Sequence, residues 1–307
     1  MSWGPDDIGD LTGLTAVVTG SNSGIGFETA LQLAVHGAHV VMACRDEKKA
    51  TFAIERFKGL DNDVSMEVLA LDLSDLASVR SAGALFASKH DRLDILVNNA
   101  GLMASPYRRS VDGFELQMAT NYFGHFAFTG LLLPFLLTTS SSRVVSVSSV
   151  MHWKGRLDFA DLGGKRKRNR WIHYANSKLA DLVFAYEFAR RLGDRGASVL
   201  SVAAHPGWTQ SNLVVSGPTL GSGKLTSRIG ETFGKYAGQP TQIGALPSLY
   251  AATARDVKSG EYFGPSGLFE MYGAPKRVGS SRRSKDLGDA KRLWEISETL
   301  TDVVYQF

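Results

Sequence analysis

Residues with distinctive chemistry occur in four short segments, in a fixed order along the chain. They are Thr19-Gly20-Ser21-Asn22-Ser23-Gly24-Ile25-Gly26, then Asn98-Asn99-Ala100-Gly101, then Ser149, and last Tyr174-Ala-Asn-Ser-Lys178. A glycine-rich segment before a helix can hold a dinucleotide pyrophosphate. A tyrosine hydroxyl beside a lysine ammonium can exchange a proton with a substrate. Each segment alone is weak evidence, but the ordered set indicates nucleotide-dependent hydride transfer to or from a carbonyl carbon.

The glycine-rich segment lies where a short apolar strand, residues 16–18, is expected to turn into a helix. Glycine allows a tight turn and leaves room for phosphate, and a helix N-terminus offers free N–H groups and partial positive charge. The spacing is Gly-x-x-x-Gly-x-Gly, not the more general Gly-x-Gly-x-x-Gly. A purely structural turn is the alternative. The strand before and the helix after favour cofactor binding by Gly20, Ser21, Asn22, Ser23, Gly24, Ile25 and Gly26.

The end of the second expected strand bears on the choice of dinucleotide. Most NAD sites place a carboxylate there for the ribose hydroxyls, but here Cys44 takes that place and Arg45 follows it. A guanidinium suits a 2′-phosphate, so NADP(H) is favoured and NAD(H) is the alternative. An ordinary surface arginine would also explain Arg45. Asp72, with Leu73 beside it, ends the third strand and could bind the adenine amino group or cap the next helix.

The fourth expected strand ends in two amides and a glycine. Asn99, Ala100 and Gly101 suit a close backbone approach to a ribose, and Asn98 is expected to tie neighbouring strands together. Ordinary turn chemistry is the alternative for such a pair of asparagines.

Tyr174 and Lys178 are four residues apart in an expected helix, so they share one face. A tyrosine of pKa about 10 transfers protons poorly at neutral pH until a cation stabilises its phenolate. Lys178 could supply that cation and also reach the cofactor ribose. Ser149 closes a strand at the edge where ligands bind in such sheets, and its hydroxyl could hold the substrate oxygen. Asn121 is polar within an apolar helix, and holding a water in a proton relay would explain it.

The elements that must position these residues alternate along the chain. Strands are expected at 16–18, 40–43, 64–71, 93–97, 143–147 and 199–204, and helices at 24–35, 46–57, 75–89, 112–137 and 173–192. This alternation predicts an α/β fold, a Rossmann-type doubly wound parallel sheet in a three-layer, single-domain arrangement. Two stretches break the pattern: residues 151–172 are expected to be a surface insertion, and the glycine-rich residues 207–240 a substrate lid. Residues 241–307 are expected to add a helix, a strand and a tail.

Together these motifs resemble the classical short-chain dehydrogenases/reductases over roughly residues 12 to 213. The resemblance rests on Thr-Gly-x-x-x-Gly-Ile-Gly, Asn-Asn-Ala-Gly, the serine, Tyr-x-x-x-Lys and Pro206-Gly207. It implies a catalytic tetrad of Asn121, Ser149, Tyr174 and Lys178, in which Ser149 is chosen over Ser148 because the family uses the second serine of such a pair. It also implies a nicotinamide-facing loop at Pro206 and Gly207, with Thr209 and Ser211 near the carboxamide or phosphates.

The residues within and beside these motifs are similar to those of the retinol dehydrogenase-like branch of that family. The similar segments are Ala43-Cys44-Arg45-Asp46, Asn121-Tyr-Phe-Gly-His125-Phe126, Tyr-Ala-Asn-Ser-Lys-Leu-Ala and His205-Pro-Gly. That branch mostly uses NADP(H), and it shares the long interval between the serine and the tyrosine. The membrane anchors of many retinol dehydrogenases are absent from this sequence, which argues against retinoid metabolism itself.

Composition limits the partners and the compartment. The chain has 307 residues and one cysteine, which excludes an intramolecular disulfide and fits a reducing compartment. No apolar run approaches the ~20 residues of a bilayer span, and the first residues lack a secretory pattern. The pI of about 9.1 arises from local clusters at 165–170 and 276–292, each with net charge +5. Such clusters are usually solvated, so a cytoplasmic protein is expected, with no nucleic acid, membrane or metal as partner.

The expected function is an NADP(H)-dependent oxidoreductase that interconverts an alcohol and a carbonyl. A hydrophobic substrate is expected because apolar residues border the reacting carbon, among them Met103, Met151, Trp153 and Trp208. These residues could instead close the core or an oligomer interface, and a homodimer is one assembly that the sequence leaves open. A non-catalytic NADP(H)-binding sensor or scaffold is the alternative function, and nucleic-acid binding through Lys165 to Arg170 is a third.

Overall fold

The structure is a computed structural model that describes residues 2–58, 64–209 and 238–307. In these residues a single sheet of eight strands runs in the order β3-β2-β1-β4-β5-β6-β7-β8. All neighbours are parallel except β8, which is antiparallel to β7. The strands are β1 (Thr15–Thr19), β2 (His39–Cys44), β3 (Met66–Ala70), β4 (Ile95–Asn98), β5 (Arg143–Val147), β6 (Leu200–Ala204), β7 (Tyr262–Pro265) and β8 (Pro275–Arg277).

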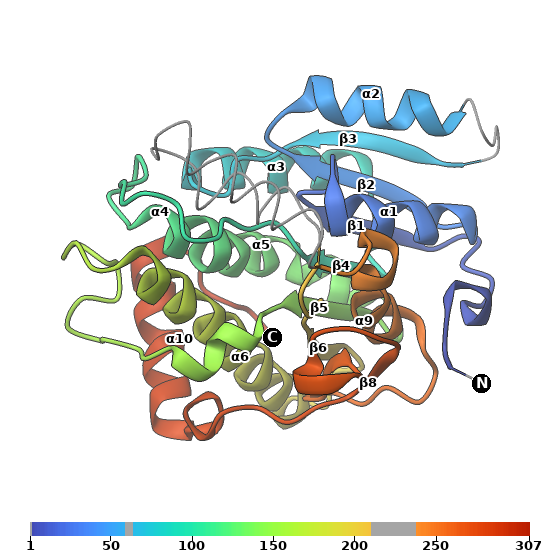
Figure 1. The fold of residues 1–307 in the computed structure, drawn as a ribbon. Helices are drawn as coiled ribbons and strands as arrows, with labels where there is room; N and C mark the ends of the chain where they lie inside the picture. The colour runs from blue at the N-terminus through green and yellow to red at the C-terminus, as the bar shows by residue number, and fades with distance from the viewer. Residues whose placement is uncertain (1, 59–63, 210–237) are drawn as a thin grey trace, which may run out of the picture.

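Helices cover both faces of the sheet (Figure 1). They are α1 (Gly24–Val35), α2 (Glu47–Lys58), α3 (Leu76–Lys89), α4 (Leu116–Met118), α5 (Gly124–Thr138), α6 (Arg170–Asp194), α9 (Thr241–Thr253) and α10 (Leu287–Thr301). Shorter turns of 3-10 helix lie at Pro5–Asp7, Val150–Lys154, Leu268–Glu270 and Arg282–Lys285. None of the helices in the described ranges is long and apolar enough to cross a membrane.

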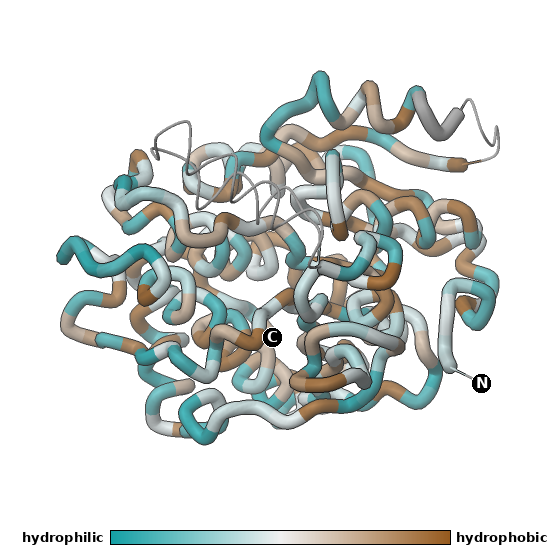
Figure 2. The backbone as a smooth tube through the Cα atoms, in the orientation of Figure 1, coloured by the Kyte–Doolittle hydropathy of each residue, from teal (hydrophilic) through white to brown (hydrophobic). Residues whose placement is uncertain are grey.

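The central strands β1, β2, β4, β5 and β6 are mainly apolar because both of their faces are covered. Val17 and Val41 point into one core, which they share with α3, α5, α6 and α10. Their neighbours Ala16, Val18 and Val40 point into the other, shared with α1, α2 and α9. Figure 2 shows hydrophobic residues along the central strands and hydrophilic ones on outlying loops. The predicted doubly wound, three-layer α/β fold is confirmed.

The position of the site follows from the strand order. From β1 the chain moves outward to β2 and β3, and then returns through α3 to β4 on the other side of β1. Ligands bind at such a reversal, outside the carboxyl ends of the strands. The segments after β1, β4 and β5 carry the glycine-rich turn, the Asn-Asn-Ala-Gly motif and Ser149. The topology therefore gathers three of the four sequence motifs at one edge.

The predicted long helix over 112–137 is confirmed from residue 116 onward, but it is not a regular α-helix throughout. The segment begins as α4, passes through a π-helical stretch (Ala119–Phe123), and continues as α5. Asn121 lies within the π-helical stretch. Single π-turns inside α-helices are often found at functional sites. The departure from regular helix therefore coincides with a residue that the sequence had already singled out.

The prediction that residues 151–172 form a surface insertion is only partly right. His152 and Leu162 are buried, and the carbonyl of Gly163 accepts a 2.7 Å hydrogen bond from the backbone of Glu115. The segment is therefore packed against the start of α4. The basic residues 165–170 do lie mostly at the surface.

Part of the positive charge in residues 165–170 is neutralised locally. Arg166 lies 3.2 Å from Asp158 and 3.2 Å from Asp161, and Arg168 also pairs with Asp158. Exposed pairs of this kind add little stability. They do reduce the field that the cluster presents to a polyanion.

Residues 241–307 complete the fold beyond β6. They form α9, β7, β8 and α10, and α10 packs over α5 and α6 through the buried Trp294. The Tyr305 hydroxyl, beyond α10, donates a 2.7 Å hydrogen bond to the carbonyl of Phe126. The C-terminal segment therefore stabilises the helical layer that carries the candidate site.

Candidate active site

The turn after β1 is shaped by glycines that no other residue could replace without movement. Gly20 has φ +64°, and a Cβ at this position would lie 2.8 Å from the Cα of Ala100. A Cβ at Gly26 would lie 2.7 Å from the carbonyl oxygen of Gly20 and would also meet the Asn99 amide. The turn therefore packs closely against the segment after β4.

The N-terminus of α1 is suited to an anion. The helix begins at Gly24, and the N-cap residue Ser23 makes no side-chain hydrogen bond to the first turn. The N–H groups of that turn are therefore not covered by the capping side chain. Ser23 is exposed and Asn22 half-exposed, whereas Ile25 packs into the core. A tight glycine turn and an uncapped helix start are what a dinucleotide pyrophosphate requires.

Ser21 does not present its side chain to a ligand. It is fully buried, and its hydroxyl donates a 2.8 Å hydrogen bond to the carbonyl of Val18. The Cys44 thiol lies 3.5 Å away, and burial raises the pKa of that thiol. Any contact of Ser21 with a cofactor would have to come from its backbone.

The hydroxyl of Thr19 connects the end of β1 to the segment after β4, at the place where the strand order reverses. It accepts hydrogen bonds from the backbone N–H groups of Asn99 and Ala100, each 2.9 Å long. The Asn99 side chain donates to the Thr19 carbonyl at 2.8 Å. The prediction that Asn98 ties neighbouring strands together is therefore wrong for its side chain, which donates instead to Thr129 on α5. Asn99 makes the link between β1 and β4.

His125 extends this link into the helical layer. Its Nε2 lies 2.8 Å from the Thr19 hydroxyl, and its Nδ1 lies 2.7 Å from the Asn121 carbonyl. A carbonyl can only accept, so Nδ1 carries the proton and Nε2 accepts from Thr19. Complete burial lowers the pKa of His125 to about 3, so the ring is neutral. Thr19 thus donates to His125 and accepts two hydrogen bonds, and the Val97 carbonyl lies 3.4 Å from its hydroxyl oxygen.

The side chain of Asn121 is held on both sides. Its Oδ1 accepts from the backbone N–H of Leu102 at 2.7 Å, and its Nδ2 donates to the Leu102 carbonyl and to the Ser177 hydroxyl. A Cβ at Gly101 would lie 3.3 Å from Oδ1 of Asn121 and 3.7 Å from Nζ of Lys178. Asn121 therefore fixes the segment after β4 against α6. That Asn121 holds a water in a proton relay stays a prediction.

The two serines after β5 have different surroundings. Ser148 is buried, and its hydroxyl donates a 2.7 Å hydrogen bond to the Lys178 carbonyl. Ser149 is half-exposed and its hydroxyl accepts a 3.2 Å hydrogen bond from the backbone of Met151. Ser149 therefore has the hydroxyl that a substrate could approach.

Lys178 is buried, and its ammonium donates two hydrogen bonds. It donates to the carbonyl of Val147 at 2.8 Å and to Oδ2 of Asp181 at 2.8 Å. Tyr174 lies one turn earlier on α6, and its hydroxyl has no hydrogen-bond partner within the described part of the chain. Burial raises the pKa of Asp181 to about 6, although the ammonium opposes that shift. A lysine, a buried carboxylate and an unengaged phenol therefore occupy one stretch of helix.

Arg45 and Asp72 lie at the carboxyl ends of β2 and β3. Arg45 is exposed, and among the ion pairs of the described residues none involves it. Its neighbour Asp46 is paired with Lys49 at 3.2 Å. Asp72 accepts two hydrogen bonds from Ser74, while Asp75 caps α3. Asp75, and not Asp72, therefore caps that helix, so this alternative for Asp72 is wrong. Leu73 is buried against the start of α5.

The loop after β6 lies beside the loop after β7. Gly207 has φ +66°, and the N–H of Trp208 donates a 2.8 Å hydrogen bond to the Met271 carbonyl. The Pro206 carbonyl accepts from the Thr209 hydroxyl and from Gln239. Ser211 and most of the expected lid, 207–240, lie outside the described residues.

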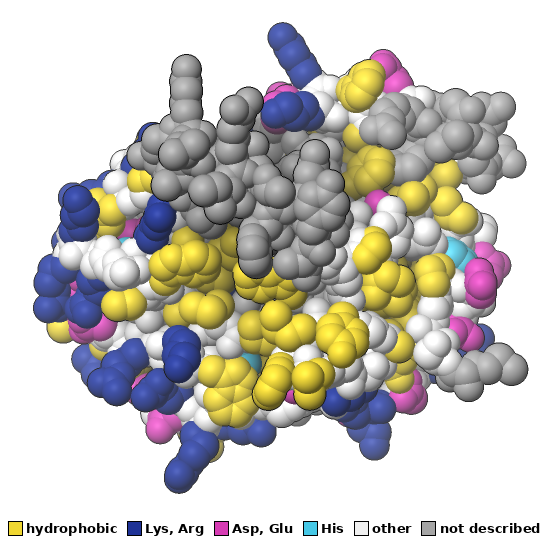
Figure 3. Space-filling model, viewed as in Figure 1, with side chains coloured by type: hydrophobic (Ala, Val, Ile, Leu, Met, Phe, Trp, Pro, Cys, Tyr) yellow, Lys and Arg dark blue, Asp and Glu magenta, His cyan; other side chains and the backbone are white. Residues whose placement is uncertain are grey.

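Apolar side chains are exposed on this second loop. Leu268, Phe269 and Tyr272 are 65%, 82% and 55% exposed, and Figure 3 shows hydrophobic side chains gathered across this face of the molecule. Phe269 and Glu270 have φ of +52° and +57°, and Oε2 of Glu270 lies 3.0 Å from Nε2 of the buried His205. This contact with His205 lowers the pKa of Glu270. It also holds the strained loop in place.

The structure brings to the site several residues to which the sequence motifs assign no role. Thr19 and His125 stand in the quoted motifs, but their hydrogen bonds depend on tertiary contacts. Asp181 lies three residues after Lys178 on a helix, a spacing that places two side chains on the same face. That spacing was the available signal for the ion pair. For Glu270 and its loop the sequence carried no such signal.

Comparison with known proteins agrees with this geometry. The pattern of the short chain dehydrogenase family matches residues 14–217. The chain is similar to retinol dehydrogenase 12 of Homo sapiens, with 38% identity over 298 residues that cover 96% of this chain and 89% of the relative. It is also similar to retinol dehydrogenase 13 of Homo sapiens, with 37% identity covering 94% of this chain and 85% of that one.

Solved structures give the same result for the fold. The chain is similar to an uncharacterized protein from Mycobacterium paratuberculosis, with TM-score 0.82, 40% identity and coverage of 100% of both chains. A short chain dehydrogenase from Escherichia coli complexed with NADPH has TM-score 0.62 and 22% identity, covering 82% of this chain and 96% of that one.

Proposed function

Because this chain belongs to the short-chain dehydrogenase/reductase family, whose members are NAD(P)-dependent oxidoreductases, we propose that it interconverts an alcohol and a carbonyl with NADP(H), using Tyr174 to transfer the proton. The observation that carries this proposal is the anchoring of Lys178. Its ammonium is fixed to the end of β5 by Val147, two residues before Ser149, and it lies on the same helix as Tyr174.

The cofactor fits the edge of the sheet. The glycine turn and the start of α1 would hold the pyrophosphate, and Gly101 leaves space next to Lys178 for the ribose. When bound, the nicotinamide would supply or accept the hydride. The residues of the chain then have to bind the substrate oxygen and move a proton.

Each polar group has a defined task in this mechanism. In the reduction direction, Ser149 holds the carbonyl oxygen and Tyr174 donates a proton to it. Lys178 stabilises the phenolate that remains, and Asp181 keeps the ammonium in position. Asn121 holds the segment after β4 against α6, so that the cofactor side and the proton side keep their spacing.

Removing the Tyr174 hydroxyl tests this assignment. We expect Tyr174→Phe to lower turnover by about 10²–10⁴-fold, because the proton donor is lost, while cofactor affinity stays near that of the wild type. Turnover is measured by nicotinamide absorbance and affinity by fluorescence titration. Tyr186→Phe is the matched control, because Tyr186 lies on the same helix but bonds to Ser280; it should retain activity. An active Tyr174→Phe enzyme would contradict the assignment. Cofactor binding without turnover by the wild type on any carbonyl would favour the sensor or scaffold function.

The preference for NADP(H) is supported by Arg45. It follows a buried, uncharged Cys44 at the end of β2, and it is exposed with no ion pair among the described residues. A guanidinium in this position can bind a 2′-phosphate with two parallel hydrogen bonds. NAD(H) has an uncharged 2′-hydroxyl in place of that phosphate.

Titration of both cofactors tests the preference. The wild type should bind NADP(H) more tightly than NAD(H). Arg45→Ala should weaken NADP(H) by roughly 1.5–3 kcal/mol, the worth of a hydrogen bond to a charged group, and leave NAD(H) unchanged. Lys291→Ala on the remote α10 removes one exposed positive charge and should change neither. Tighter binding of NAD(H) by the wild type would overturn the proposal.

A hydrophobic substrate is supported by the apolar side chains around the loop after β6. Trp208 belongs to that loop, Leu268 and Phe269 stand on the neighbouring one, and Met151 and Trp153 follow Ser149. Ligand pockets are lined mainly by such side chains with few polar groups. A hydrophobic alcohol or aldehyde suits these surroundings better than a sugar or a charged acid.

A chain-length series of straight aldehydes tests the substrate class. Each methylene that enters an apolar pocket should improve kcat/KM by an amount equivalent to about 1–3 kcal/mol until the pocket is full. Steady-state assays with saturating NADPH measure the trend. A flat series, or a preference for short polar carbonyls, would exclude a hydrophobic pocket.

A further inference from the structure

A cluster of potential metal ligands lies away from the candidate active site. It consists of His39, Glu67 and His90, whose nearest ligand atoms all lie within 4.8 Å of one another. His39 begins β2, Glu67 is the second residue of β3, and His90 is the C-cap of α3. The candidate active site is at the carboxyl ends of the strands, so this cluster lies at the opposite edge of the sheet.

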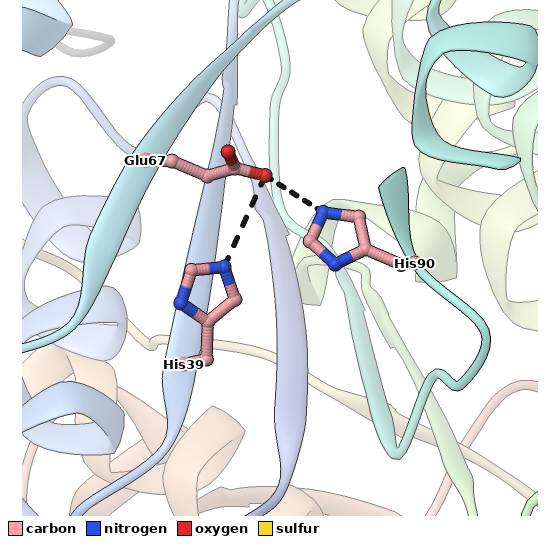
Figure 4. A group of neighbouring side chains, drawn as sticks. All are labelled: His39, Glu67 and His90. Carbon is pink, nitrogen blue, oxygen red and sulfur yellow. Dashed lines mark hydrogen bonds and ion pairs between the residues drawn. The ribbon is translucent and has the colours of Figure 1, made fainter. Parts of the chain in front are cut away.

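The Glu67 carboxylate lies between the two imidazole rings (Figure 4). Its Oε1 is 2.7 Å from Nε2 of His90 and 3.9 Å from Nε2 of His39. The second distance is too long for a hydrogen bond. Ligand atoms of a tetrahedral zinc ion, with bonds of about 2.0–2.2 Å, lie roughly 3.3–3.6 Å apart. The two measured distances therefore require only small side-chain movements to surround an ion.

The orientation of both rings is supported by neighbouring groups. Nδ1 of His39 lies 2.7 Å from the Ser65 hydroxyl, which leaves Nε2 directed at Glu67. The ring of His90 stacks on Phe86, with centroids 4.6 Å apart. The arrangement of His39, with its second ring nitrogen bonded to another group, is common in metal-binding histidines. The side chains of His39 and Glu67 are 34% and 29% exposed, so water can reach the site.

One neighbouring charge acts against a cation. Nζ of Lys89 lies 3.4 Å from Oε2 of Glu67. This ammonium occupies the other carboxylate oxygen, so Oε1 is the oxygen that remains for a metal ion. A simple ion pair between Glu67 and His90 would explain that contact alone. A protonated His39 would likewise pair with this oxygen at 3.9 Å, so metal titration distinguishes an ion-pair cluster from a zinc site.

We propose that His39, Glu67 and His90 bind Zn²⁺ through two imidazole nitrogens and one carboxylate oxygen, with water as the fourth ligand. This set of ligands and four-coordinate tetrahedral geometry are typical of zinc. The ion would join the starts of β2 and β3 to the end of α3. Because the unfolded chain lacks this arrangement, binding would stabilise the folded state. The proposal is independent of the proposed function, since the site takes no part in hydride transfer.

Calorimetric titration of the chelator-treated full chain with zinc chloride tests the proposal. The wild type should bind one equivalent and show a raised Tm with zinc. His90→Ala, His39→Asn and Glu67→Gln should each weaken that binding by at least tenfold. Lys89→Ala should bind at least as tightly as the wild type, because it removes the competing ammonium. His36→Ala, whose ring bonds to the Gln32 carbonyl outside the cluster, is the control and should bind normally.

Cobalt provides a second readout that does not depend on stability. Four-coordinate Co²⁺ should give visible absorption bands in the wild type and lose them in His90→Ala and His39→Asn. The folding of each variant without metal is checked by circular dichroism, and the two conservative variants, His39→Asn and Glu67→Gln, keep the test valid if His90→Ala fails to fold. Absence of one-equivalent zinc binding, or binding that persists in His39→Asn and Glu67→Gln, would overturn the proposal.

Discussion

The buried ammonium of Lys178 fixes the geometry of the rest of the site. A charge removed from water costs several kcal/mol unless it is paired and hydrogen-bonded, and this one is satisfied by the Val147 carbonyl and the Asp181 carboxylate. Val147 ends β5, so the bond locks α6 against the sheet at one register. Tyr174 then lies one turn before the lysine, and Ser149 lies two residues beyond its anchor. A different register would leave the ammonium without the Val147 carbonyl, and only Asp181, on the same helix, would remain as a partner.

The hydroxyl of Thr19 provides the corresponding constraint on the cofactor side. It accepts hydrogen bonds from the backbone N–H groups of Asn99 and Ala100 and donates one to His125. His125 in turn donates a hydrogen bond to the carbonyl of Asn121. Through these bonds the end of β1, the turn after β4 and the π-helical stretch before α5 become one hydrogen-bonded unit. Asn121 also links this unit to α6, because its side-chain amide donates a hydrogen bond to the Ser177 hydroxyl. The two halves of the site are therefore held in register through side chains that bear no charge.

The fold could be predicted because parallel strands buried on both faces appear as short apolar runs between helical patterns. The candidate site residues could be selected because glycine turns, Asn-Asn-Ala-Gly and Tyr-x-x-x-Lys have distinctive spacing. The π-helical stretch could not be predicted from local spacing; in the structure Asn121 and His125 make tertiary contacts there with Leu102 and Thr19. The choice of Asn98 as the link between strands failed for a similar reason. Either asparagine could make that bond, and only the tertiary structure brings Asn99 to Thr19.

The pH dependence of alcohol oxidation in Asp181→Asn is the most direct test of the central claim, that Tyr174 transfers the proton and that the charge of Lys178 stabilises its phenolate. At neutral and alkaline pH the Asp181 carboxylate, whose pKa burial raises to about 6, is ionised and offsets part of the Lys178 charge. Replacing it with a neutral amide should leave more positive charge beside the phenol, so the proton should leave at lower pH. We expect the rate to reach its plateau at a lower pH than in the wild type, with cofactor affinity retained. An unchanged profile in a folded, cofactor-binding variant, or a shift to higher pH, would contradict the account.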